Sequence, residues 1–99
     1  MKIKMSKHVM VDRADRMVYI MQTVGFGETV VFTHVHDGAR ECLTETGVIM
    51  VKAMHEERLI TAYIPSLDKV SAMYTEMGLR VPQYMIRKIG NNQKYRKGF

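Results

Sequence analysis

The chain has 99 residues, of which 46% are hydrophobic and 25% are charged, which indicates a single globular domain rather than a disordered segment. Its uncharged apolar runs, such as residues 17–21 and 48–51, are too short to cross a bilayer, so no membrane partner is expected. The first eight residues contain no apolar signal segment, and Cys42 is the single cysteine. We therefore expect a cytoplasmic protein with neither disulfides nor a cysteine-based zinc site.

Charge is distributed unevenly along the chain. Residues 1–7 carry three basic side chains and residues 80–99 carry six, and neither segment contains an acidic residue. The intervening residues 8–79 carry six basic and ten acidic side chains, so a mildly acidic body lies between two cationic ends. Because lysine and arginine bind phosphates with release of counterions, this pattern favours RNA or another polyanion as a partner. Short basic termini that only keep the protein soluble are the alternative interpretation.

The first predicted element is an amphipathic helix over residues 7–23. Ser6 is a suitable N-cap, and the apolar residues that follow recur at the spacing of one helical face. After Gly27 the apolar period shortens to that of a strand, and four such segments follow, at residues 29–35, 40–46, 48–54 and 59–64. Turn residues separate them at 37–38, 47 and 55–58, which predicts a meander of three or four antiparallel strands.

Two short helices are predicted after the sheet. The first covers residues 67–77 with Ser66 as its N-cap, the second covers 82–89, and a glycine ends each of them. Residues 91–99 are polar and basic, and we expect a flexible tail there. The predicted fold is therefore a single α+β domain over residues 1–90, with an N-terminal helix packed on an antiparallel meander.

The second predicted hairpin supplies a candidate polar face. With a loop at residues 55–58, Lys52 lies opposite Thr61, and Tyr63 points to the same side of the sheet. The other side is then wholly apolar and is expected to face the core. An ammonium, a hydroxyl and a phenol on one face are donors suited to a phosphate. A half-covered sheet face with a few polar residues is the alternative.

Two histidines in the first predicted strand are further candidates. A turn at Asp37 and Gly38 places His34 opposite Glu41, which predicts a cross-strand pair of imidazole and carboxylate. His34 could transfer a proton or contact a phosphate, and an incidental surface position is the alternative. His34 and His36 form a His-x-His pair, but no further ligand has suitable spacing, so neither a metal site nor a cofactor is predicted.

Cationic residues near both ends are candidates for nucleic-acid binding. Lys7 and His8 lie in the first turn of the predicted N-terminal helix, where free backbone N–H groups favour an anion. The C-terminal segment mixes cations and amides with one tyrosine that could stack on a base, a composition suited to a flexible RNA or DNA strand. The candidates in this segment are Arg87, Lys88, Lys94, Tyr95, Arg96 and Lys97.

A short motif and a later strand carry a family resemblance. Ser6-Lys7-His8 opens an amphipathic helix that contains Arg13 and Arg16, and the sheet that follows ends in Leu59-Ile60-Thr61-Ala62-Tyr63-Ile64. Residues 6–64 in this order resemble the barnase/EndoU/colicin/RelE-like toxin ribonucleases. The resemblance implies a helix packed on a four-stranded sheet and a metal-independent site that cleaves RNA. It also implies that His8 matches the helix histidine, Arg13 or Arg16 the helix arginine, and Thr61 the hydroxyl of the final strand.

The chemistry implied by this family is attack of an RNA 2′-hydroxyl on the neighbouring phosphate. A histidine, His8 or His34, would serve as base or acid, because imidazole titrates near neutral pH. Lys52 and Arg16 would stabilise the charged phosphorane, with hydrogen bonds from Thr61 and Tyr63. We therefore expect a toxin-like ribonuclease or an RNA-binding domain, with an antitoxin as a further partner. The alternative is a small non-catalytic interaction protein of a phage or mobile element that binds a host protein or nucleic acid.

Overall fold

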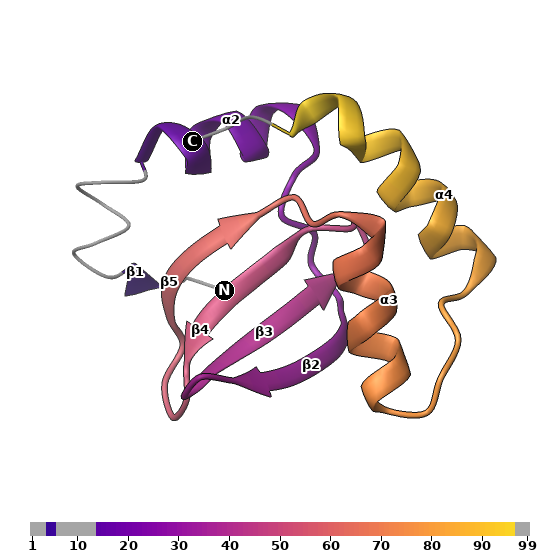
Figure 1. Ribbon diagram of the computed structural model, residues 1–99. Coiled ribbons are helices and arrows are strands. Elements are labelled where there is room, and N and C mark those ends of the chain that lie inside the picture. Colours follow the sequence, from indigo (N-terminus) through magenta and orange to yellow (C-terminus); the bar gives the residue numbers. More distant parts are fainter. Residues whose placement is uncertain (1–3, 6–13, 97–99) are drawn as a thin grey trace.

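The structure of the protein is a computed structural model that describes residues 4–5 and 14–96 (Figure 1). The predicted α+β fold is confirmed: a helix, a meander of four antiparallel strands and two further helices follow one another along the chain. The elements in chain order are β1 (Lys4–Met5), α2 (Ala14–Thr23), β2 (Val30–His36), β3 (Ala39–Thr44), β4 (Ile49–Ala53), β5 (Arg58–Tyr63), α3 (Leu67–Glu76), α4 (Gln83–Asn92) and the 3-10 helix η1 (Gln93–Tyr95). Residues 7–13 of the predicted first helix lie outside the described residues.

The strands form one sheet in the order β1-β5-β4-β3-β2. The turn between β2 and β3 is the predicted two-residue one, because His36 pairs with Ala39 across it. Asp37 and Gly38 have φ angles of +50° and +73°, as a type I′ turn requires. The short β1 pairs parallel to β5 and was not predicted, since two residues are too few to show a strand period.

Both faces of the sheet are covered by helices, whereas the sequence predicts one apolar face towards the core and a polar face on the other side. Neighbouring residues of a strand point to opposite faces. On the side of Cys42, the sheet packs against Met17 and Ile20 of α2. On the side of Leu43, it packs against buried residues of α3 and α4: Val70, Met73, Tyr74, Met85 and Ile89. Figure 1 shows α2 above the sheet and α3 and α4 to its right.

The register of the second hairpin differs from the predicted one by one residue. Tyr63 pairs with Ile49, and Thr61 pairs with Val51. A bulge at Ile60 then brings Leu59 opposite Lys52, and the loop spans residues 54–57. Because a slip of one residue moves a side chain to the other face, the prediction that Lys52, Thr61 and Tyr63 share a face is wrong. Lys52 points to the α2 side of the sheet, whereas Thr61 and Tyr63 point to the side of α3 and α4.

The C-terminal helices hold the end of the chain against the sheet. Ser66 caps α3 as predicted, because its Oγ accepts a hydrogen bond of 3.1 Å from the Lys69 backbone N–H. Helix α4 does not end at Gly90 but continues to Asn92, whose buried amide donates a 2.8 Å hydrogen bond to the Thr46 carbonyl. The predicted start of the flexible tail, at residue 91, is therefore too early, since residues 91–95 are helical. No helix within the described part of the chain is both long and apolar enough to span a membrane.

Candidate nucleic-acid interface

A pocket of 170 Å³ lies between α2, the end of β5 and the C-terminal η1. Its walls contain two arginines, Arg16 and Arg96, and three tyrosines, Tyr19, Tyr63 and Tyr95, together with two isoleucines. No acidic side chain contributes to the walls formed by the described residues. Guanidinium groups bind phosphate, and aromatic rings pack against flat apolar groups, so the pocket suits a ligand that combines both.

The α2 side of this pocket follows from the orientation of the helix. Met17 and Ile20 are buried against the sheet, with exposed fractions of 4% and 2%. Arg16 and Tyr19 precede these two residues by one position each and line the pocket together with Tyr63 of β5. The two side chains are one helical turn apart and line the same wall.

The C-terminal wall is fixed by side-chain amides. The Gln93 amide donates a 3.0 Å hydrogen bond to the Pro65 carbonyl, close to where Asn92 is bound to Thr46. Tyr95 packs against the α2-side core, and the Lys94 ammonium lies 5.1 Å from the centre of its ring. The exposed Arg96 follows directly. The sequence assigns Tyr95 and Arg96 to a flexible tail, but in the structure both residues line the pocket.

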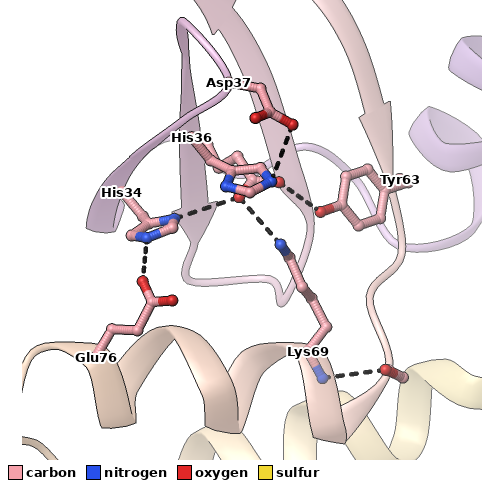
Figure 2. A network of polar contacts seen from close by, with 8 residues as sticks. His34, His36, Asp37, Tyr63, Lys69 and Glu76 are labelled. Carbon is pink, nitrogen blue, oxygen red and sulfur yellow. Dashed lines mark hydrogen bonds and ion pairs between the residues drawn. The ribbon is translucent and has the colours of Figure 1, made fainter.

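A polar network on the α3 side of the sheet is centred on Glu41, which is only 7% exposed. Figure 2 shows His34, Tyr63 and Lys69 arranged around the centre of this network. The Tyr63 hydroxyl donates a 2.9 Å hydrogen bond to Glu41 Oε2, and the Lys69 ammonium donates one of 3.1 Å to Oε1. His34 Nδ1 lies 3.4 Å from Oε1, so the predicted pairing of His34 with Glu41 across β2 and β3 is confirmed. The other ring nitrogen of His34 contacts Glu76, which ties α3 to the sheet.

This network determines the protonation of its members. Burial raises the pKa of Glu41, but the hydrogen bonds from Lys69, Tyr63 and His34 together outweigh it, so the pKa lies below its ordinary value. Burial, and then the hydrogen bond to Glu41, raises the pKa of Tyr63 well above its ordinary value. Tyr63 therefore stays protonated at neutral pH, and its single hydroxyl proton is donated in the hydrogen bond to Glu41.

Lys52, proposed from the sequence as a phosphate ligand, lies at the hairpin end of the sheet. Its ammonium donates a 2.7 Å hydrogen bond to Glu57, and Arg40 contacts the other oxygen of the same carboxylate at 3.3 Å. Hydrogen bonds from Lys52 and then Arg40 lower the pKa of Glu57, so its charge opposes theirs at neutral pH. The structure thus places Lys52 in a local ion-pair cluster and at the opposite end of β5 from Tyr63.

Lys52 is paired at the hairpin and does not line the pocket, so we expect the substitution Lys52→Met not to alter the affinity of the protein for the RNA partner predicted from the sequence. Methionine can fill the same space, and the released Glu57 is half-exposed and remains hydrated. Fluorescence anisotropy with a labelled RNA, together with thermal unfolding, measures both properties. A weaker RNA complex from a variant of unchanged stability would return Lys52 to the binding site.

The other histidine and the remaining predicted site residues lie on the sheet, near the C-terminus or outside the described residues. Thr61 lies on the α3 side of β5, and the exposed His36 contacts Asp37 at 3.2 Å. Arg87, Lys88 and Lys94 are exposed near the C-terminus. Four candidates lie outside the described residues: Lys7, His8, Arg13 and Lys97. Within residues 4–5 and 14–96, no group of three or more potential ligands from His, Cys, Asp and Glu is placed to hold a metal ion.

Sequence reasoning did not select two tyrosines that belong with these cations. Tyr19 follows Arg16 by one helical turn and shares its wall of the pocket. Tyr84 is 50% exposed and precedes Arg87 and Lys88 at the helical spacing of three and four residues. The signal for both is a tyrosine one turn from an arginine on an exposed helical face. We call the exposed side of α4, formed by Tyr84, Arg87, Lys88 and Asn91, its outer face.

The pocket and the outer face of α4 together form the candidate interface. They are connected through η1, which continues α4 and ends in the pocket wall. Residues 77–96 contain no acidic side chain, so α4 and η1 contribute only positive formal charge to this surface. Comparison with models of protein families, with curated proteins and with solved structures finds no match to this chain.

Proposed function

We propose that this protein binds RNA through the pocket and the outer face of α4. The observation that carries the proposal is the composition of the pocket. Arg16 from α2, Tyr63 from β5, and Tyr95 and Arg96 from the C-terminus line one hollow. The sequence nominates Arg16 and Tyr63 for catalysis and Tyr95 and Arg96 for nucleic-acid binding, from three distant segments. Their convergence supplies guanidinium groups for phosphate and aromatic rings for bases.

The outer face of α4 extends the cationic surface beyond the pocket. Arg87 and Lys88 are exposed on it, and Lys94 follows on η1. No carboxylate within residues 77–96 competes for these cations. Side chains of this kind contact the sugar-phosphate backbone and provide affinity with little sequence preference.

Metal-independent cleavage of the bound RNA is the second candidate function. It is supported by Arg16, which was assigned to catalysis from the sequence and lines the pocket, whereas the Tyr63 hydroxyl is bound to Glu41. His34 is held between Glu41 and Glu76 and does not line the pocket. His8 is therefore the histidine to test as acid or base, and its loss is expected to slow cleavage by about 10²–10⁴-fold.

Titration of a labelled RNA at rising salt tests the proposal. We expect the logarithm of the association constant to fall linearly with the logarithm of salt concentration, and Arg96→Gln and Arg87→Gln each to reduce the slope by about 1. Arg58→Gln is the matched control, because Arg58 pairs with Glu56 at 2.8 Å in the hairpin and does not line the pocket. The same slope for all three variants and the unmodified protein would contradict the proposed interface.

The same reactions distinguish the functions from one another. RNA products that form without added metal and persist in EDTA support cleavage, whereas salt-sensitive retention of intact RNA supports binding alone. Neither retention nor cleavage at low salt would contradict both functions and favour a protein partner instead.

A further inference from the structure

The pocket is small for an interface that binds a polymer. Its volume of 170 Å³ is below the range of about 300–1,000 Å³ that is typical of sites for drug-sized molecules. A space of this size holds one flat ring system with part of its attached chain. The rest of an RNA strand would lie outside it, on the exposed cationic side chains.

The aromatic and cationic side chains in the pocket walls are arranged in a way that suits a nucleotide. Tyr19 and Arg16 bring a ring and a guanidinium group from α2, and Tyr95 of η1 and the following residue, Arg96, bring another ring and another guanidinium group. The helix α2 and the C-terminal segment therefore each offer one ring and one cation. A base between the rings would have its phosphates within reach of cations on both sides.

The C-terminal part of this wall is preorganised. Asn92 donates to the Thr46 carbonyl at 2.8 Å and Gln93 donates to the Pro65 carbonyl at 3.0 Å, so η1 is fixed against two separate loops. Tyr95 is also packed against the α2-side core. A ring that is already ordered loses little conformational freedom when a base packs on it.

A base can enter such a pocket only when it is unstacked and unpaired. In an A-form duplex each base is stacked and paired, and releasing it has a free-energy cost, whereas single-stranded RNA presents its bases freely. We propose that the pocket accepts one unpaired nucleotide of RNA, whose base packs against Tyr19 and Tyr95, and that this contact selects single-stranded over duplex RNA. The inference rests on the proposed RNA binding and specifies the form of RNA that is bound.

Fluorescence anisotropy with one labelled strand, free or annealed to its complement, tests the inference at constant salt. We expect the single strand to bind about tenfold more tightly than the duplex. Tyr95→Leu keeps an apolar side chain for the core but removes the ring, and we expect it to lose about tenfold in affinity for the single strand and little for the duplex. Tyr95→Phe retains the ring and should keep the preference.

The possible failures are distinguishable. Equal affinity of the unmodified protein for the single strand and the duplex would overturn the inference and leave the proposed RNA binding in place. An equal loss on both RNAs from Tyr95→Leu, with an unchanged melting temperature, would also overturn it. Absence of binding to either RNA would contradict the proposed function and with it the inference.

Discussion

Replacing Gly47 with alanine is expected to lower the free energy of unfolding by about 3 kcal/mol. Gly47 is the third of the four loop residues 45–48 between β3 and β4, and it has a φ of +82°, in the left-handed region that favours glycine. A Cβ there would lie 2.7 Å from the Asn92 amide nitrogen and 3.1 Å from Ile89 Cδ1. The substitution therefore adds backbone strain and also displaces α4. The side-chain amide of Asn92 in α4 donates a hydrogen bond to the carbonyl of Thr46, the residue before Gly47.

Gly38→Ala is the matched control for this prediction. Gly38 also has a positive φ, of +73°, but a Cβ at this position would meet no atom within 4 Å. The difference between the two variants in chemical denaturation thus isolates the contact between Gly47 and α4 from the strain that both share. We expect a drop in melting temperature of about 15 °C for Gly47→Ala. Equal losses in the two variants would show that the close approach of α4 contributes nothing to stability.

Much of the fold could be predicted because its signals are local. The type I′ turn is encoded by Asp37-Gly38, the start of α3 by Ser66, and the strands by the change of period after Gly27. The pairing of His34 with Glu41 follows from that turn alone. Each of these features depends on residues that are close together in the sequence.

The candidate site was harder to predict because it depends on non-local packing. A single extra residue in β5, Ile60, reverses the faces of the second hairpin and separates Lys52 from Tyr63. No pattern in the strand marks this bulge, since both faces of the sheet are covered and the strands do not alternate cleanly. The C-terminal wall was missed because the polar side chain of Asn92 finds its partner in a distant turn.

Replacing Glu41 with alanine is expected to lower the free energy of unfolding at neutral pH by about 3 kcal/mol. The buried carboxylate accepts hydrogen bonds from Tyr63 and Lys69 and pairs with His34. Its removal leaves these groups without their acceptor in a partly dehydrated space. Glu76→Gln is the control, because Glu76 contacts the same His34 but is 62% exposed, and we expect a much smaller loss. Equal losses in the two variants would contradict a central role for Glu41.

The pH dependence of stability provides a separate test of the same residue. Because the folded state holds the pKa of Glu41 below its ordinary value, the stabilisation is complete above the unfolded-state pKa of about 4.3 and is lost as the pH falls through the lower folded-state pKa. Glu41→Gln cannot titrate, so its stability should fall less steeply below pH 5 than that of the unmodified protein. Some acid sensitivity will remain, since backbone hydrogen bonds lower the pKa of Glu45 as well. An unchanged acid slope in Glu41→Gln would mean that the network does not distinguish the charged carboxylate from the neutral one. The hydrogen bond of Tyr63 would then not depend on the charge of Glu41.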